Sequence, residues 1–251
     1  MRGVHDATLL VLRPSGEWVV VRAPELLRPV GVAASSDTLL EVIDGDASRL
    51  LVLTLEGRIV RNTAVAAPFQ VDQAQRTADG WALVGTDAEG GMVLAWADAA
   101  GSVGPAVRLP VPDSVPVDAH FTPRGATVLV GLAGAPHTVW HAAPGEPVRE
   151  AGFATPDLAG AVARAAGVEP LWVSVGLVPV GEGFLRTFSD LRSDHRLFVL
   201  YDADGAILRQ TMVDSPVGVI GAVPGQEVLV GVRRVERPEL VLYGWRWRTE
   251  R

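Results

Sequence analysis

Short apolar runs, each ended by a turn signal, follow one another along the whole chain. The clearest pair lies within residues 197–212, where two β-rich runs flank Asp204-Gly205. This dipeptide is typical of tight turns because glycine supplies the positive φ that they need. Related hairpins turn at Gly16, Gly57, Gly101 and Gly145. Successive turn glycines lie 41, 44, 44 and 60 residues apart, which indicates a repeat of about 44 residues with one insertion.

A second set of signals has the same period. Five short β-rich segments each begin at a proline, which suits the first residue of a strand because no ladder N–H is needed there. A turn and a more hydrophobic strand follow each segment, and the hairpin comes next. The starting prolines are Pro29, Pro68, Pro116, Pro170 and Pro216. The repeating unit is therefore four strands in meander order, which we call A, B, C and D.

Four-stranded units of this length predict an all-β fold, a β-propeller of four-stranded antiparallel blades, because one such sheet buries both faces only when neighbours stack against it around an axis. Complete units are predicted at residues 28–66, 67–112, 115–155 and 170–214. Residues 216–248 supply strands A to C, and residues 7–23 match strands C and D. Pairing of the N- and C-terminal strands would close the ring. We expect five blades, with six as the alternative, because both terminal segments contain a C-like strand.

The insertion at about residues 155–167 accounts for the long step between turn glycines. Thr155 suits a helix cap, Pro156 suits a first helical turn and Gly167 suits a helix end, so we expect a short surface helix. It follows the third complete unit, as a decoration or as a lid. We expect residues 1–251 to form a single propeller domain that carries this helix.

The first complete unit contains Arg28-Pro-Val-Gly-Val-Ala, a strand ending in Asp44, and the run from Arg49 to Gly57-Arg-Ile-Val-Arg. This sequence pattern resembles that of the NHL-type and related six-bladed propellers of bacteria. Their blades read Pro-x-Gly-(Val/Ile)-Ala, then a strand ending in Asp, then Arg-(Val/Ile)-x-x-(Phe/Tyr)-Asp-x-x-Gly. The resemblance implies a binding platform at least as readily as an enzyme. We expect the chain to differ from the family in having one blade fewer and in lacking the leader that those proteins often carry.

The amino-acid composition excludes several kinds of catalytic chemistry and binding partner. The net charge is −7 without a run of like charge, so nucleic acid is not an expected partner. All 22 basic residues are Arg and there is no Cys, which excludes a lysine Schiff base, thiolate catalysis and disulfides. No segment approaches the ~20 apolar residues of a membrane span, and no signal peptide is evident. We expect a cytoplasmic protein without membrane contact, or a secreted one if a leader was removed.

Strand A lines the central channel of a propeller, so its polar residues are the first candidate site. Positions two and four after each starting proline share one side of the strand. We predict that six of these side chains bind a ligand: Gln70, Asp72, Asp118, His120, Trp172 and Ser174. Asp118, His120 and Asp72 are also catalytic candidates, because a carboxylate beside an imidazole orients it and raises its pKa. The alternative is that these groups only hydrogen-bond to one another and to channel water.

Acidic residues in the B-to-C loops are predicted at the mouth of the same channel. Their oxygens could hold Ca²⁺, which takes six to eight ligands, or they could simply be solvated. These residues are Asp44, Asp46, Asp87, Glu89, Asp190, Asp194 and Glu236. Related propeller lactonases and phosphotriesterases hold a divalent ion through Glu, Asn and Asp. The single Asn of this chain, Asn62, is predicted on an outer strand, which counts against that ligand set.

We therefore expect a non-enzymatic binding module that presents its channel-mouth face to a protein or small-molecule ligand. The alternative is a divalent-metal-assisted hydrolase or lactonase with its site in the central channel. Zinc-ligand spacing and the Gly-x-Ser-x-Gly motif are both absent from the sequence.

Overall fold

The computed structural model describes residues 8–13, 15–110, 119–133, 135–158, 171–193, 195–214, 217–222, 228–233 and 239–244. Contacts divide the chain into two compact units. The first contains residues 1–111, 123–128 and 143–148, and the second contains residues 112–122, 129–142 and 149–251. The single domain expected over residues 1–251 stays a prediction.

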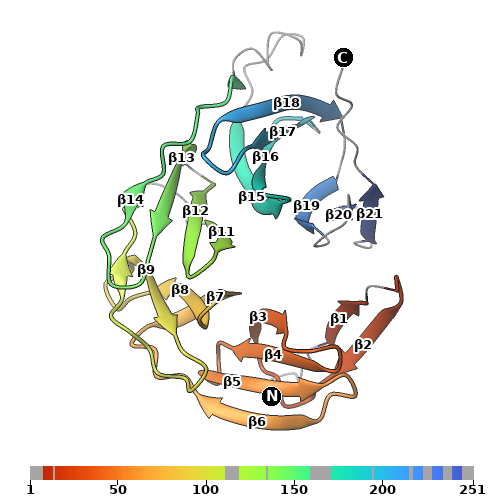
Figure 1. The fold of residues 1–251 in the computed structure, drawn as a ribbon, viewed down its shortest axis with the longest axis vertical. Helices are drawn as coiled ribbons and strands as arrows, with labels where there is room; N and C mark the ends of the chain where they lie inside the picture. Colours follow the sequence, from red (N-terminus) through yellow and green to blue (C-terminus); the bar gives the residue numbers. More distant parts are fainter. Residues whose placement is uncertain are drawn as a thin grey trace. The chain divides into compact units, whose positions relative to one another are not determined.

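The first unit contains a hairpin and two four-stranded antiparallel meanders (Figure 1). The hairpin pairs β1 (Thr8–Leu12) with β2 (Trp18–Arg22). One meander runs β3 (Pro29–Ala34), β4 (Leu39–Asp44), β5 (Arg49–Thr54) and β6 (Ile59–Ala64). The other runs β7 (Gln70–Arg76), β8 (Trp81–Thr86), β9 (Met92–Ala97) and β10 (Val107–Arg108).

A third meander has segments in both units and runs β11 (Ala119–Arg124), β12 (Thr127–Leu132), β13 (Ala135–Ala142) and β14 (Arg149–Glu150). The second unit holds a fourth, β15 (Trp172–Val180), β16 (Gly183–Asp190), β17 (His195–Tyr201) and β18 (Ile207–Asp214). A three-stranded sheet follows, with β19 (Val217–Ala222), β20 (Val228–Arg233) and β21 (Glu239–Gly244).

These sheets confirm the predicted units: four complete meanders, strands A to C after them, and a C–D hairpin before them. Among the described strands, no ladder joins β21 to the hairpin, so closure of the ring by the terminal strands stays a prediction. The expected helix at about 155–167 lies outside the described residues after Leu158. Within the described part of the chain, no helix is long and apolar enough to cross a membrane.

The hairpins turn at the predicted glycines. The φ angles are 84° at Gly16, 83° at Gly57, 82° at Gly101, 73° at Gly145 and 86° at Gly205. The side chain three residues before the glycine supports several of these turns. One oxygen of Asp98 accepts hydrogen bonds from two backbone N–H groups of its turn, and Asp202 does the same before Gly205. Local turn chemistry therefore positions the hairpins that repeat along the chain.

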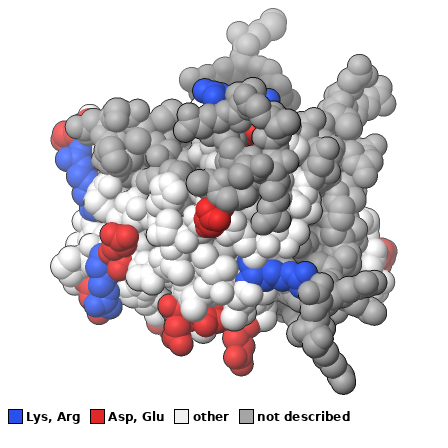
Figure 2. Space-filling view, turned by 90° about the horizontal axis from the view of Figure 1, so that it is seen from above, with Lys and Arg blue, Asp and Glu red and all other residues white. Residues whose placement is uncertain are grey.

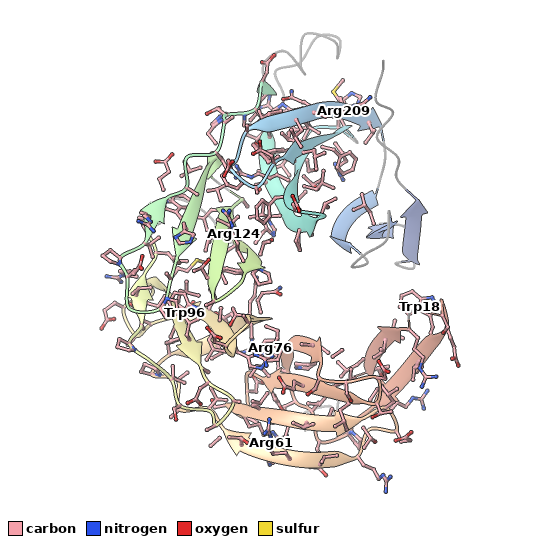
Figure 3. All side chains as sticks on the ribbon, viewed as in Figure 1. Trp18, Arg61, Arg76, Trp96, Arg124 and Arg209 are labelled. Atoms are coloured by element: carbon pink, nitrogen blue, oxygen red, sulfur yellow. The ribbon has the colours of Figure 1, made fainter. Side chains whose placement is uncertain are left out.

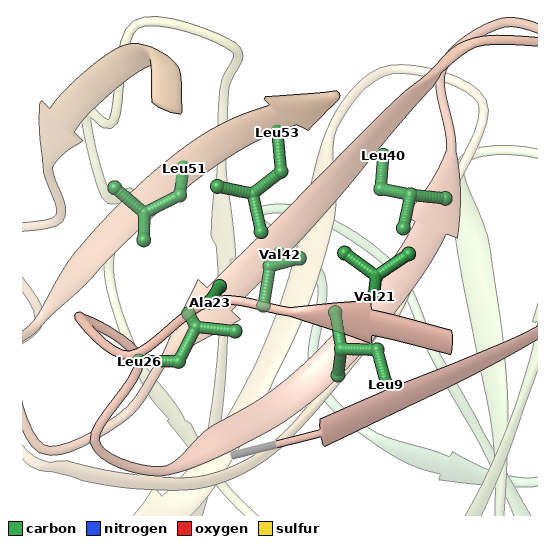
Figure 4. Packing of buried hydrophobic residues seen from close by; sticks show 8 residues of the cluster. All are labelled: Leu9, Val21, Ala23, Leu26, Leu40, Val42, Leu51 and Leu53. Carbon is green, nitrogen blue, oxygen red and sulfur yellow. The ribbon is translucent and has the colours of Figure 1, made fainter. Parts of the chain in front are cut away.

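The hydrophobic core lies between the faces of successive sheets. In the first unit, Leu9 and Val21 of the hairpin pack against one face of the β3–β6 sheet (Figure 4). The residues that this sheet contributes to the cluster include Leu40, Val42, Leu51 and Leu53. On another side of the sheet, Ile43 and Leu50 join a cluster with Trp81 and Leu83 of the next sheet. Strands β4 and β5 are thus covered on both faces, which agrees with their mostly apolar sequences.

A buried carboxylate also joins these two sheets. Glu41 on β4 is only 7% exposed. Its Oε2 accepts a hydrogen bond from Nε1 of Trp81 at 3.3 Å and forms an ion pair with Nε of Arg76 at 3.1 Å. Arg61 on β6 lies 3.8 Å from Oε1; Figure 3 labels both arginines. Charge pairing therefore adds to apolar packing at this interface between sheets.

The second unit repeats the same packing. Leu129 and Val139 contact Leu177 and Phe184 of the next sheet. On the far side of that sheet, a second cluster contains Val178, Val180, Leu185 and Leu229, the last from β20. Within each unit, successive sheets therefore bury apolar faces against one another, as the repeat predicted.

Candidate ligand-binding site

The first strand of four sheets carries a register shift. The shifts lie between Pro29 and Gly31 in β3, Val71 and Gln73 in β7, Ser174 and Gly176 in β15, and Val219 and Gly221 in β19. A β-bulge of this kind adds one residue to a strand and redirects its side chain. In β7 the added residue is Asp72.

Asp72 lies within a cluster of polar side chains in the first unit. Its Oδ1 accepts a hydrogen bond from Nε2 of Gln70 at 3.1 Å, and its Oδ2 accepts one from Oγ1 of Thr86 at 3.2 Å. Nη1 of Arg28 lies 3.4 Å from Oδ1. The structure thus brings together two of the predicted ligand-binding residues, Gln70 and Asp72. It adds Arg28 and Thr86, which sequence reasoning did not select.

Arg28 is the centre of this cluster. Its Nε donates to Oδ1 of Asp46 at 2.5 Å, and its Nη2 donates to the carbonyl oxygen of Val71 at 2.7 Å. Arg28, Asp46 and Asp72 keep side-chain exposures of 32%, 54% and 40%. Arg28 precedes Asp72 by 44 residues, one repeat, and directly precedes the first starting proline. That spacing was the signal in the sequence that could have revealed it.

Asp44 has a different role from the one its position in a loop suggested. Its side chain is fully buried. The backbone N–H groups of Arg28 and Leu27 donate to its two carboxylate oxygens at 3.0 and 3.1 Å, and Arg49 lies 3.2 Å from Oδ2. Burial acts to raise the pKa of Asp44, but these donors outweigh it and hold the pKa below 3.8. Asp44 therefore fastens the start of β3 to the end of β4.

Asp190 has the same structural role in the second unit, where it joins the start of β15 to the end of β16. Its Oδ1 accepts from the N–H groups of Leu171, just before β15, and of Arg192, and its Oδ2 accepts from Ser193 Oγ at 2.6 Å. Burial acts to raise the pKa of Asp190, but these hydrogen bonds together lower it. Asp44 and Asp190 thus have equivalent structural roles, each at the end of the second strand of its own sheet.

Asp87, in another of these loops, is engaged as well. Asp87 accepts two backbone N–H groups of its own turn and lies 3.4 Å from Nη2 of Arg108. Asp194 and Glu236 lie outside the described residues. Within the described ranges, no three His, Asp or Glu side chains form a group that could hold one metal ion. Between Asp46 and Asp72, the guanidinium of Arg28 takes the position that a cation would need.

The remaining predicted site residues belong to the second unit or lie outside the described chain. Asp118 lies outside it. Nε2 of His120 is 2.9 Å from the carbonyl oxygen of Ser174. A carbonyl only accepts, so Nε2 carries the proton and the ring links β11 to β15. Ser174 and Trp172 are 0% and 8% exposed, so they lie in the interior of this unit, unlike Gln70. A joint site of Asp72 with His120 stays a prediction.

Ser174 is buried against an arginine that the sequence analysis did not select. Arg186 on β16 is 1% exposed; its Nε donates to Ser174 Oγ at 3.3 Å and its Nη2 to the carbonyl oxygen of Thr138 at 3.0 Å. Its guanidinium carbon lies 4.9 Å from the centre of the Phe188 ring. Burial lowers the pKa of Arg186 to about 10, so it stays charged at neutral pH. The sequence feature that could have revealed Arg186 is a single arginine within a mostly apolar strand.

The stacked meanders define this chain as an all-β protein of the β-propeller class, with four-stranded antiparallel blades. No protein-family model matches the sequence, and no curated protein matches it. Solved structures match the fold. A protein provisionally assigned as a 6-phosphogluconolactonase from Bacteroides uniformis has a TM-score of 0.58 at 13% identity, over 99% of this chain and 77% of its own.

Two further structures are similar. A member of the DUF4221 family from Bacteroides vulgatus has a TM-score of 0.55 at 11% identity, over 91% of this chain and 84% of its own. A protein of unknown function from Bacteroides caccae has a TM-score of 0.51 at 15% identity, over 96% of this chain and 88% of its own. At these identities the similarity concerns the fold alone, and it bears out the predicted resemblance to bacterial propellers at that level.

Proposed function

We propose that this chain is a non-enzymatic binding module whose ligand, a small molecule or a protein segment, contacts the cluster formed by Arg28, Asp46, Gln70, Asp72 and Thr86. One observation carries the proposal. The charged groups of this cluster are partly exposed, yet they are already paired with one another. Figure 2 shows one face of the molecule, with acidic and basic side chains adjoining at its left edge.

This pairing favours binding over catalysis. A general base needs a carboxylate or imidazole that is free to take a proton near neutral pH. Both oxygens of Asp72 already accept hydrogen bonds, so its carboxylate is not free in this sense. A paired and partly exposed set of donors and acceptors instead offers a ligand fixed hydrogen-bonding positions at little cost in reorganisation.

A binding experiment with matched variants tests this proposal. The purified protein is screened by saturation-transfer NMR against separate sets of neutral sugars, amino acids, nucleotides and short peptides. Ligands of the cluster are expected to bind the wild type and to lose binding in the Gln70→Ala, Asp72→Ala double variant. Gln75→Ala is the control, since Gln75 is exposed on the same strand. Hits that bind the double variant as well as the wild type would place the ligand elsewhere.

The alternative function is a divalent-metal-assisted hydrolase or lactonase that uses Asp118, His120 and Asp72 with Ca²⁺. It is tested on the same protein preparation with aliphatic lactones and a phosphotriester, in millimolar calcium or in EDTA. Calcium-dependent turnover that His120→Ala abolishes would replace the binding proposal with this one. Absence of turnover, together with ligand binding at the cluster, supports the binding module.

A further inference from the structure

We infer that the ligand of this cluster is a neutral polyhydroxylated molecule, a sugar or polyol that presents two adjacent hydroxyl groups. The inference rests on the proposed function, because it names the chemistry of a ligand for that same site. Its basis is the combination of planar side chains, paired charges and fixed geometry around Arg28.

The cluster presents donors and acceptors side by side. A guanidinium has five N–H groups, and Arg28 uses one on each nitrogen for Asp46, Asp72 and Val71. Within the described residues, this leaves one N–H on each Nη atom for a ligand. The carboxylates of Asp46 and Asp72 lie within 3.4 Å of the same guanidinium and are more exposed than it. A ligand that contacts Arg28 therefore meets a carboxylate oxygen at the same time.

The surrounding backbone holds these groups in place. A Cβ at Gly45 would lie 2.9 Å from Nη2 of Arg28 and 2.6 Å from the carbonyl oxygen of Val71. A Cβ at Gly85 would lie 1.7 Å from the carbonyl oxygen of Gln70. Because glycine occupies both positions, the backbone lets Arg28 and Gln70 approach closely. The Arg28 side chain, which donates three hydrogen bonds, recognises a ligand with little loss of its own conformational freedom.

Charge decides between classes of ligand. An anion would meet the two exposed carboxylates of Asp46 and Asp72 around the guanidinium of Arg28, so it would be repelled. A cation would have to displace Arg28 from the two carboxylates and leave a guanidinium unpaired. A hydroxyl group donates one hydrogen bond and accepts others, so two adjacent hydroxyls can bridge a carboxylate oxygen and a guanidinium N–H without breaking the ion pairs.

An exposed apolar residue adjoins Arg28 in the sequence. Leu27 directly precedes Arg28 and is 62% exposed, although its backbone N–H is fixed by Asp44. A sugar ring has a C–H face as well as hydroxyl groups, and an exposed leucine next to planar polar groups offers surface for both. A free ion or a small amine would make no use of this side chain.

The test measures binding of D-glucose, D-galactose and myo-inositol by saturation-transfer NMR, with glucosamine, glucuronate and spermidine as charged comparisons. At least one neutral compound is expected to bind, and Gln70→Ala and Asp72→Asn are each expected to weaken it about tenfold or more. Arg28→Lys keeps the charge but loses the planar fork, so it is expected to weaken binding similarly. Gln75→Ala is expected to leave binding unchanged.

Two results would overturn the inference. If only charged compounds bind, or if Arg28→Lys binds as tightly as the wild type, the site selects charge and not hydroxyl pairs. If none of the neutral compounds binds while a peptide or nucleotide from the broader screen does so through Gln70 and Asp72, the binding module stands and the polyol inference fails. Calcium-dependent turnover would instead remove the binding module itself, which keeps the two failures distinct.

Discussion

Asp44 offers the most direct test of how this fold is held together. Replacement by alanine removes the acceptor of two backbone N–H groups, those of Leu27 and Arg28, and the carboxylate partner of Arg49. Because the Asp44 side chain is fully buried, water does not replace these contacts without local opening. The start of β3 and the end of β4 then lose the group that joins them.

The expected loss follows from these contacts. A buried donor without an acceptor costs about 1–3 kcal/mol, and breaking a buried ion pair by removing one partner costs about 3–5 kcal/mol. Arg49 keeps a 19% exposed side chain and a hydrogen bond to the carbonyl oxygen of Glu25, so water relieves part of its loss. We therefore expect Asp44→Ala to lower the free energy of unfolding by about 3–5 kcal/mol. Asp44→Asn, which keeps one carbonyl acceptor, is expected to cost about half as much.

The pH dependence adds an independent prediction. The folded-state pKa of Asp44 lies below its unfolded value, so the stabilisation is complete above the unfolded pKa of about 3.9 and is lost as the pH falls through the folded pKa. The difference in unfolding free energy between wild type and Asp44→Asn is therefore expected to be constant above about pH 5 and to shrink at lower pH.

Urea unfolding followed by tryptophan fluorescence measures these differences, since Trp81 is 1% exposed in the same unit. The control is Asp46→Ala: Asp46 has a 54% exposed side chain in a surface ion pair and is expected to cost less than about 1 kcal/mol. If Asp44→Ala and Asp46→Ala are equally mild, or if the Asp44→Asn difference does not change with pH, Asp44 does not fasten the sheet.

Three further predictions concern the packing and the turns, and all are tested by the same urea measurement. Replacing Glu41 with alanine removes the buried carboxylate that pairs with two guanidinium groups and accepts a hydrogen bond from an indole. We expect the free energy of unfolding to fall by about 2–4 kcal/mol. An unchanged stability would show that these donors find other acceptors. Gly205→Ala should lower the free energy of unfolding more than Gly16→Ala does. Both glycines have φ near 85°, but of the two only Gly205 would place its new Cβ against a side chain, that of Phe153 at 2.5 Å. Equal losses would mean that φ alone matters. Leu51→Ala should cost about 2–5 kcal/mol and Leu10→Ala, at a residue 54% exposed, less than about 0.5 kcal/mol; the reverse order would contradict the packing of the hairpin.

Most of the architecture could be predicted from the sequence because its signals are local. A glycine such as Gly57 or Gly205 marks a turn by its own backbone freedom, and a proline such as Pro29 marks a strand start by its missing N–H. These signals repeat with the blade, so they identified four complete meanders and the terminal strands. Closure of the ring depends on contacts distant in sequence and has no comparable signal.

The candidate site was only partly predictable for the same reason. Gln70 and Asp72 were selected by strand period, and they do meet, but through a bulge that no residue type announces. The same rule selected Trp172 and Ser174, which are buried: Trp172 packs in an apolar cluster, and Ser174 receives a hydrogen bond from Arg186 on the neighbouring strand. Whether an acid such as Asp44 is solvated or buried depends on which N–H groups the folded chain places beside it.

The two buried aspartates have a consequence for how this chain can change by duplication of its gene. Asp44 binds N–H groups seventeen and sixteen residues before it, and Asp190 binds one nineteen residues before it. Each of these attachments begins and ends inside a single repeat. A copied segment of one repeat therefore carries its own attachment, and blade number can vary without new partners having to evolve in the rest of the molecule.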